Sequence, residues 1–311
     1  MFDTDIGSDV DDALALGVLL AEAPALDLVA VTTVAGDTRL RARIAARLLG
    51  AAGRREIEVC AGDEVPLLRA RERFVWFGHE GRGLPDAADA LLSEEPAAQR
   101  IVRAAQEHPG LELVAVGPLT NVARALALDP KLPERIATLW VMGGHVRSVR
   151  LGDRELPPGI DYNLCSDPEA TMAVLGAGFR TTLIPAEVTL RTWMAPADVA
   201  QLEAAPGVFA RALGEMLRIW SGAQAKLFET WGGTAPSDFA AFLHDPLTAL
   251  ALVDASALHL ETLRIVLTVQ NGVLRTFEVA PGSHAGSDMT VATDVDPQAA
   301  RHAILTRLIG L

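Results

Sequence analysis

The sequence predicts an α/β fold, an open, doubly wound and mostly parallel sheet with flanking helices and a small antiparallel addition near the C-terminus. Two observations carry this prediction. Short apolar runs rich in Val, Ile and Leu alternate with stretches of helical periodicity, and two later runs flank the hairpin dipeptide Asn271-Gly272. Half of the 311 side chains are apolar, which is enough to bury a large core.

Four apolar runs are predicted to be parallel strands that are buried on both faces. They cover residues 27–34, 111–116, 136–142 and 181–185. The helices predicted beside them cover residues 12–23, 38–52, 97–107, 121–128 and 167–175. This alternation implies right-handed βαβ units, and ligands of such sheets bind beyond the carboxyl ends of the strands. Residues just after each predicted strand are therefore the first candidates for a functional site.

The later part of the chain is predicted to add to the same sheet. Residues 207–231 have the pattern of one long helix, and residues 258–269 and 273–279 are predicted to pair as antiparallel strands. The polar stretch 147–159 contains two prolines and is interpreted as a mobile flap, not as a linker between domains. We therefore expect a single domain over residues 1–311.

Charge and cysteine content restrict the class of partner and the compartment. The chain has 27 basic and 40 acidic side chains, and its net charge of -13 argues against nucleic acid or an anionic membrane as a partner. A small neutral or cationic ligand is expected instead. Cys60 and Cys165 are too few for a disulfide framework, and no signal peptide or apolar span of about 18 residues is found, so the expected location is the cytoplasm.

Five aspartates are concentrated near the N-terminus. Carboxylates this close repel one another unless a cation neutralises them, and oxygen ligands without nearby His or Cys favour Ca²⁺ or Mg²⁺ over zinc. The alternative is that one of the last two caps the following helix while the others are solvated. Only two residues precede the cluster, where a buried strand normally leads in, so we expect the natural start to lie several residues earlier. The cluster consists of Asp3, Asp5, Asp9, Asp11 and Asp12.

Thr120 stands at a loop-to-helix junction in the motif Gly-Pro-Leu-Thr-Asn. Gly117 and Pro118 end the predicted strand, so the carbonyl or hydroxyl group of Thr120 could face a ligand at the edge of the sheet. For Thr120 in isolation, a plain helix cap is the stronger interpretation.

His244 and Asp245 come directly before another predicted helix, at residues 247–253. An imidazole beside a candidate metal ligand can pass a proton to a leaving group near neutral pH. Taken alone, a His-Asp pair in this place is more often a helix cap with a satisfied neighbour. The functional interpretation of this His-Asp pair therefore depends on the other motifs in the sequence.

Asp161 and Asn163 are predicted to lie on one face of an extended stretch, where they could bind sugar hydroxyls. A turn-forming Asn is an equally good interpretation of this pattern. Met142 lies upstream, at the end of a predicted strand, and Asp167 with Pro168 has the pattern of a helix start.

In this order, the motifs resemble the inosine-uridine preferring nucleoside hydrolase family. The likeness runs from Asp3 to about Asp245 and is looser beyond. The matching segments are residues 3–12, 31–37, 117–121, 141–144, 162–170 and 244–246. The resemblance implies a nucleoside hydrolase-like fold and an enzyme that hydrolyses the N-glycosidic bond between ribose and a nucleobase.

The resemblance also implies a metal site. Ca²⁺ would be held by Asp5, by both carboxylate oxygens of Asp12, by the main-chain carbonyl of Thr120 and by Asp245, with a water and two ribose hydroxyls completing the shell. Asp5 would also take the proton from this water. The chemistry agrees, because carboxylates stabilise an oxocarbenium-like transition state and a cation-held water needs no covalent intermediate.

The substrate-binding residues follow from the same resemblance. Asp11, Asp161 and Asn163 would bind the ribose, Met142 would pack nearby, and His244 would stand beside the leaving base as the candidate acid.

Two positions depart from the common family pattern or match it weakly. Asp37 stands where many members have a ribose-binding Asn, and His79 stands where some have a histidine near the base. Both are candidate substrate-binding residues, although His79 alone is more simply interpreted as a surface loop residue. The aspartate cluster is also two residues longer than the shortest family version, so the role of Asp9 in the metal shell stays open.

Two further predictions concern the preference for a nucleobase and the oligomeric state. Segments 74–82 and 224–238 are expected to set the preference for purine or pyrimidine. Trp220, Phe228 and Trp231 could stack on a base, although packing of a long helix is the stronger interpretation for each. Because family members are often dimers or tetramers, a homodimer or homotetramer is implied by the resemblance.

Two other functions compete with this interpretation. A phosphohydrolase of the haloacid dehalogenase type could use the Asp-Thr-Asp segment, but the few lysines, Lys131 and Lys226, are poorly placed for it. A calcium-stabilised nucleoside-binding domain without turnover is the other, and His244 beside Asp245 with Asp5 retained argues against it.

Overall fold

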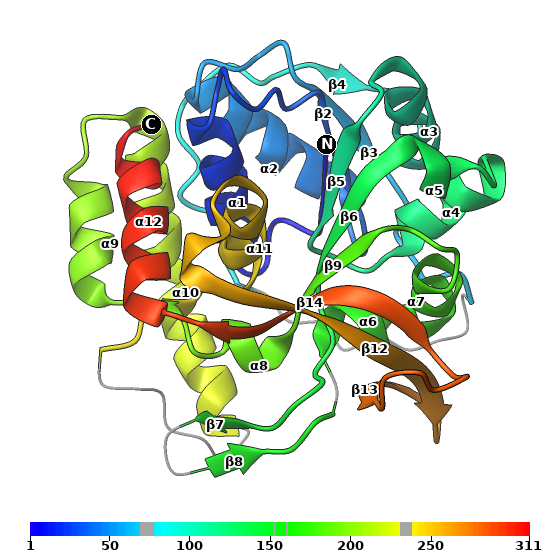
Figure 1. The fold of residues 1–311 in the computed structure, drawn as a ribbon. Helices are drawn as coiled ribbons and strands as arrows, with labels where there is room; N and C mark the ends of the chain where they lie inside the picture. The colour runs from blue at the N-terminus through cyan, green and yellow to red at the C-terminus, as the bar shows by residue number, and fades with distance from the viewer. Residues whose placement is uncertain (69–77, 152–153, 160, 231–237) are drawn as a thin grey trace.

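Ten strands form one sheet in the order β13-β12-β14-β9-β6-β5-β1-β2-β3-β4 (Figure 1). The structure is a computed structural model that describes residues 1–68, 78–151, 154–159, 161–230 and 238–311. Neighbouring strands are parallel from β4 to β14, and β12 pairs antiparallel with both β14 and β13. The strands are β1 Phe2–Thr4, β2 Ala30–Thr33, β3 Glu58–Ala61, β4 Leu92–Ser93, β5 Leu111–Ala115, β6 Ile136–Met142, β9 Thr181–Ile184, β12 Leu258–Gln270, β13 Val273–Val279 and β14 Ser287–Val295.

Helices cover both faces of this sheet. In Figure 1, α1, α9, α10, α11 and α12 lie on one side, and α3, α4, α5 and α7 lie on the other. The helices are α1 Asp11–Ala21, α2 Thr38–Ala51, α3 Ala97–Glu107, α4 Thr120–Leu128, α5 Leu132–Arg135, α6 Tyr162–Ser166, α7 Pro168–Leu175, α8 Ala186–Thr189, α9 Pro196–Glu203, α10 Val208–Thr230, α11 His244–Val253 and α12 Pro297–Ile309, with a 3₁₀ turn at Ala255–Ala257. Within the described ranges, no helix is both long and apolar enough to cross a membrane.

The hydrophobic core has two parts, one on each side of the sheet. Strand β5 shows why, because Val114 packs into the part that contains α1 and α10, while Leu113 and Ala115 pack into the part that contains α3 and α4. Side chains of a strand alternate between its two faces, so a strand covered on both faces is mainly apolar. This explains why several strands appear as nearly continuous apolar runs in the sequence.

The order of the strands reverses direction at β1. The chain leaves β1 to build β2, β3 and β4 on one side, and then returns to build β5, β6 and β9 on the other. Loops that follow β1 and β5 therefore diverge, and a crevice opens between them beyond the carboxyl ends of the strands. Asp5 and Gly117 lie in these two loops.

The predicted fold class is confirmed, and the four predicted parallel strands and five helices are all present within a few residues of their predicted ends. The predicted hairpin is also present, with β12 and β13 joined at Asn271 and Gly272, whose φ angles are 54° and 78°. Two successive positive φ angles are typical of a tight two-residue hairpin turn. The mobility of stretch 147–159, which was interpreted as a flap, stays a prediction. The stretch contains the antiparallel strands β7 Val149–Leu151 and β8 Arg154–Leu156.

Candidate active site

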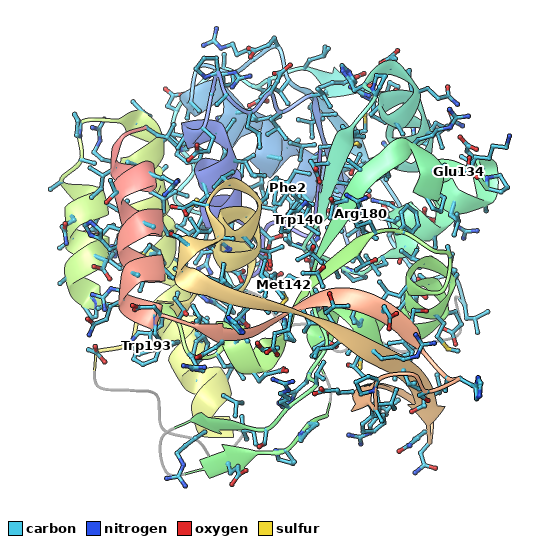
Figure 2. The ribbon with its side chains drawn as sticks, in the orientation of Figure 1. Phe2, Glu134, Trp140, Met142, Arg180 and Trp193 are labelled. Carbon is cyan, nitrogen blue, oxygen red and sulfur yellow. The ribbon has the colours of Figure 1, made fainter. Side chains whose placement is uncertain are left out.

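A cavity of about 460 Å³ opens at the carboxyl ends of the central strands. One end is acidic and is lined by aspartates from the loop after β1, from α1 and from α11. The other end is mainly apolar and is lined by side chains of α10 and its neighbours. Figure 2 shows Met142, at the end of β6, in the interior of the molecule, and its side chain lines the same cavity. The acidic lining residues are Asp5, Asp9, Asp11, Asp12, Glu64, Asp161 and Asp245.

Three of these carboxylates converge from opposite ends of the sequence. Oxygen atoms of Asp11, Asp12 and Asp245 lie within 4.8 Å of one another, and all three residues are buried. Asp11 and Asp12 belong to the first turn of α1, and Asp245 belongs to the first turn of α11. The two helices pack together, so their N-termini direct partial positive charge toward the same point.

The electrostatics of this group favour a bound cation. Burial raises the pKa values of Asp11, Asp12 and Asp245 well above the ordinary carboxyl value, and repulsion among the neighbouring aspartates raises them further. Three buried carboxylates cannot all be ionised at neutral pH without a positive charge between them. The donor set consists of oxygen atoms only, which fits a hard divalent ion such as Ca²⁺ or Mg²⁺.

Asp5 lies beside this group and not within it. It lines the cavity, and its charge contributes to the raised pKa values of Asp12 and Asp245. The sequence prediction placed Asp5 in the metal shell and Asp11 on the ribose. The structure brings Asp11 into the three-carboxylate group, and the role of Asp5 as a ligand stays a prediction.

Gly117, in the loop after β5, leaves room for the Asp5 carboxylate because it has no side chain. A methyl group at Gly117 would lie 2.8 Å from a Val34 side-chain carbon and 2.9 Å from Oδ1 of Asp5. We expect Gly117→Ala to displace the Asp5 carboxylate and to lower kcat about 10-fold or more, while overpacking costs about 1–3 kcal/mol of stability. Steady-state kinetics and thermal unfolding measure the two effects. Unchanged kcat would show that Asp5 does not need this position. Gly222→Ala is the matched control, because Gly222, like Gly117, has no positive φ angle and its added methyl group would meet nothing within 4 Å.

Thr120 is the first residue of α4, and the N-cap position belongs to Leu119. The helix-cap alternative for Thr120 is therefore wrong. Its hydroxyl donates a hydrogen bond of 2.7 Å to Oδ2 of Asp167, and the side chain is buried. Thr120 is not among the described residues that line the cavity, so the proposed contact of its carbonyl with a metal stays a prediction.

Asn121, the next residue, ties three strand ends together. Its amide nitrogen donates to Oδ1 of Asp3 at 2.8 Å and to the carbonyl of Thr33 at 3.0 Å, while its amide oxygen accepts from the backbone N–H of Asp63 at 2.9 Å. These bonds join the ends of β1, β2 and β3 at the floor of the site. No sequence pattern indicates this function of Asn121, because its partners are far apart along the chain.

Asp161 and Asn163 line the cavity, but not as predicted. They do not alternate along an extended stretch, because Asp161 is the N-cap of α6 and accepts from the N–H of Leu164 at 2.8 Å. Asn163 lies inside the helix, and its amide nitrogen donates to the carbonyl of Val116 at 2.6 Å and to that of Met142 at 3.2 Å. Burial raises the pKa of Asp161 to about 6.

Asp37 lies away from the cavity lining. It is exposed and caps α2, with its carboxylate accepting from the N–H of Leu40 at 2.8 Å. The helix-capping role explains why an acid is stable there. The assignment of Asp37 to direct ribose binding stays a prediction.

His79 is fully buried, so its interpretation as a surface loop residue is wrong. Its Nε2 lies 3.0 Å from the carbonyl oxygen of Asp9, and its Nδ1 accepts from the N–H of Gly81 at 3.1 Å. These partners place the ring proton on Nε2, which donates to the carbonyl. Because the backbone occupies both ring nitrogens, His79 supports the aspartate loop, and its candidate contact with the substrate stays a prediction.

His244 lines the cavity as the first residue of α11, beside Asp245. Its Nδ1 lies 2.6 Å from the hydroxyl oxygen of Thr189, and its ring lies 5.2 Å from that of Phe242. Burial lowers the pKa of His244 to about 4, so the resting imidazole is neutral at pH 7. Its other nitrogen, Nε2, is the ring atom left for the cavity.

The apolar end of the cavity is built largely by α10. Trp220, Gln224 and Leu227 are spaced by four and three residues, so they share one face of the helix and line the cavity. Trp220 is 1% exposed, which agrees with its predicted packing role. Gln224 is buried, and its Oε1 has no hydrogen-bond partner among the described residues. Nothing is described of the Phe228 side chain, and Trp231 lies outside the described residues.

A positively charged side chain, Arg41, also lines the cavity. Arg41 of α2 lines the acidic end, donates from Nε to the carbonyl of Ala35 at 2.6 Å, and its charge opposes the rise in the pKa of Asp12. A lone arginine in an amphipathic helix carries no sequence signal for such a position.

The buried acids predict how stability depends on pH. Burial raises the pKa values of Asp3 and Asp9 to about 7. An acid whose pKa is higher in the folded state binds protons more tightly when folded, so its stabilisation is complete below its unfolded pKa and is lost as pH rises through about 7. The unfolding temperature of the metal-free protein should therefore fall between about pH 5 and pH 8. Added Ca²⁺ should raise the unfolding temperature more at pH 8 than at pH 5. Thermal unfolding with and without a chelator tests this, and an equal Ca²⁺ effect at both pH values would contradict it.

Comparisons with known proteins agree with this geometry. The family model described as inosine-uridine preferring nucleoside hydrolase matches residues 1–302. A pyrimidine-specific ribonucleoside hydrolase of Klebsiella pneumoniae is 33% identical over 258 residues, which are 80% of this chain and 77% of that protein. A probable uridine nucleosidase of Oryza sativa is 30% identical over 81% of this chain and 73% of its own length.

Solved structures show the same fold. A plant nucleoside hydrolase superposes with a TM-score of 0.84 at 25% identity, covering 100% of this chain and 98% of its own. A purine-preferring ribonucleoside hydrolase of Gardnerella vaginalis superposes with a TM-score of 0.81 at 25% identity, covering 99% of this chain and 97% of its own.

Proposed function

Because the chain belongs to the inosine-uridine preferring nucleoside hydrolase family, we propose a mechanism for its activity, which is hydrolysis of the N-glycosidic bond of ribonucleosides to ribose and free base. The observation that carries the mechanism is the convergence of Asp11, Asp12 and Asp245 on one buried point. Neither the phosphohydrolase nor the binding domain without turnover is supported by the comparisons.

The proposed cofactor is one Ca²⁺ ion. The three converging carboxylates would hold it, and Asp5 and the carbonyl of Thr120 are the further ligands that the family resemblance implies. When bound, the ion relieves the repulsion among these acids and lowers the pKa of a water that it orients toward the substrate. Mg²⁺ is the alternative with the same preference for oxygen ligands, but it demands stricter octahedral geometry.

The protein groups around the ion divide the remaining work. Asp5 accepts a proton from the attacking water, whose oxygen forms a bond to ribose C1′ while the bond between C1′ and the base nitrogen breaks. The electron pair of that bond leaves with the base, which takes up a proton from solvent. The ribose acquires oxocarbenium character, which the surrounding carboxylates stabilise. Asp161 and Asn163, fixed at the cavity wall by α6, hold the sugar hydroxyls, and Met142 packs beside them.

The leaving base is proposed to occupy the apolar end of the cavity. Trp220, Leu227 and Phe242 offer it apolar surface, and the amide oxygen of Gln224, which has no hydrogen-bond partner in the described part of the chain, offers it a hydrogen-bond acceptor. His244 stands at this end, and its neutral imidazole suits it to donate a hydrogen bond to the departing base. We predicted that His244 acts as an acid. Because the resting imidazole is neutral, it can donate a hydrogen bond to the base but carries no second proton to transfer.

Release of ribose from nucleosides tests the function directly. A panel of common purine and pyrimidine nucleosides, assayed for reducing sugar, should show turnover of at least one nucleoside. A chelator should abolish this turnover, and excess Ca²⁺ should restore it. Turnover that persists after complete removal of metal would contradict the proposed cofactor, and release of phosphate from phosphate esters in place of ribose would contradict the function.

Further proposals concern the organisation of the chain and its setting. A single domain over residues 1–311 is supported by one sheet that contains both β1 and β14. A cytoplasmic location is supported by two unpaired thiols, Cys60 and Cys165. A homodimer or homotetramer rests on the family resemblance alone, and light scattering of the purified protein tests it.

A further inference from the structure

Arg41 stands at the acidic end of the cavity. Among the described residues that line the cavity it is the only arginine or lysine, and seven acidic residues share the lining with it. Its guanidinium group lies against the loops after β1 and β2, because a methyl group added at Gly7 would lie 3.3 Å from Nη1 and one added at Gly36 would lie 3.6 Å from Nη2. The absence of side chains at these two glycines leaves room for a cation beside the aspartates.

The backbone holds this guanidinium group in place. Its Nε donates a hydrogen bond of 2.6 Å to the carbonyl of Ala35. Ala35 has a φ angle of 68°, which residues with a side chain rarely adopt, and its N–H donates to the carbonyl of Asp63 at 2.7 Å. Within the described part of the chain, neither Nη1 nor Nη2 has a hydrogen bond or an ion pair. The charge of Arg41 is therefore held near the acids of the cavity without a direct bond to any one of them.

A fixed positive charge near these acids affects the empty and the metal-bound site differently. Burial raises the pKa of Asp12 most, and the charge of Arg41 opposes this rise, so Arg41 stabilises the ionised acids while no metal is bound. A divalent cation held by Asp11, Asp12 and Asp245 would neutralise much of their negative charge and would itself be repelled by the guanidinium group. Arg41 therefore favours the empty site over the occupied one.

We propose that Arg41 is a built-in counter-cation that stabilises the empty aspartate group and thereby weakens the binding of Ca²⁺. This inference rests on the proposed function, because it takes Ca²⁺ to be the cofactor that these acids hold. It adds a residue that does not coordinate the ion and acts on its affinity through charge. The concentration of Ca²⁺ at which half of the enzyme is loaded is then set in part by Arg41.

Three substitutions separate the charge of Arg41 from its shape and from the total charge of the protein. Arg41→Gln removes the charge, and Arg41→Lys keeps it. Arg43→Gln is the matched control, since Arg43 lies in the same helix and is exposed, so its loss changes the net charge equally. Calorimetric titration with Ca²⁺ at pH 8, where few protons compete with the ion, measures Kd for each protein.

We expect Arg41→Gln to bind Ca²⁺ about 5-fold more tightly than the wild type, because a repulsion between like charges is removed. Tb³⁺ carries one more positive charge, so its Kd should fall further, by about 10-fold. Arg41→Lys and Arg43→Gln should bind both ions within about 2-fold of the wild type, since one keeps the charge and the other loses only a screened surface charge. In chelator, Arg41→Gln should unfold about 2 °C or more below the wild type, because the empty site has lost its counter-cation.

Several outcomes would overturn the proposal. One is a Kd for Ca²⁺ in Arg41→Gln that equals or exceeds that of the wild type. Others are an equal gain in affinity in Arg41→Lys or Arg43→Gln, or a gain for Tb³⁺ no larger than that for Ca²⁺, because each excludes local repulsion between charges as the cause.

The folding of the variant and the binding of Ca²⁺ by the wild type also decide the question. An Arg41→Gln variant that folds only with Ca²⁺ would support the proposal, and one that does not fold even with Ca²⁺ would show that Arg41 is a structural residue and the proposal is wrong. Absence of Ca²⁺ binding by the wild type would remove the proposed cofactor and this inference with it. Equal Kd values in the wild type and Arg41→Gln would remove the inference alone.

Discussion

Asp245→Asn is expected to lower kcat for nucleoside hydrolysis by roughly 10³-fold, which corresponds to a loss of several kcal/mol of transition-state stabilisation. The reason is that Asn keeps the shape of Asp245 but removes one of the three charges that converge with Asp11 and Asp12. Steady-state kinetics with a saturating nucleoside measure the loss.

Although it lowers activity, the same substitution should not lower the stability of the metal-free protein. Burial, followed by repulsion from neighbouring aspartates, raises the pKa of Asp245, so a neutral side chain there stabilises the metal-free protein. We therefore expect Asp245→Asn to unfold at a temperature no lower than the wild type in chelator, and to gain much less from added Ca²⁺. Asp27→Asn is the matched control, since the Asp27 side chain is 80% exposed. Full activity of Asp245→Asn would contradict the assignment of Asp245 to the metal.

Asp5→Asn is expected to lower kcat by about 10²–10⁴-fold, the range observed for loss of a general base. Asp5 lies outside the group of three carboxylates, so this variant should keep more of its Ca²⁺ affinity than Asp245→Asn does. Titration calorimetry and kinetics on both variants measure the two quantities. If Asp5→Asn loses Ca²⁺ binding as completely as Asp245→Asn, Asp5 acts chiefly as a ligand and its role as a separate base is wrong.

Much of the fold could be predicted because burial on both faces leaves a simple pattern. A parallel strand covered by helices is mainly apolar, as β5 and β6 are apart from Glu112 and Thr138, and helix periodicity marks the segments between them. The Asn271-Gly272 turn was equally predictable, since its positive φ angles demand such residues. Strands β3 and β4 were missed because they are short and partly exposed.

The acidic half of the site could be predicted, because its residues form local motifs. Asp11 and Asp12 belong to a dense cluster, and Asp245 stands beside a histidine at a helix start. The sequence could not reveal which oxygen atoms converge, and the structure brought Asp11 into the group in addition to the two predicted ligands.

The supporting residues of the site could not be predicted, because their partners are distant along the chain. Thr189 meets His244 only when α8 packs against α11, and His79 meets Asp9 only when its loop folds over the aspartate cluster. Gln224 is ordinary in a helix sequence, and burial in the cavity wall makes it conspicuous. The residue types alone, without the fold, do not indicate that these side chains support the site.

The position of the metal is the most direct test of the mechanism. Crystals of the protein grown with Ca²⁺ should give one strong anomalous peak per chain, about 2.3–2.6 Å from carboxylate oxygens of Asp12 and Asp245. A map without a peak between these two residues, from crystals of protein that hydrolyses nucleosides, would contradict the proposal that their convergence holds the ion required for catalysis.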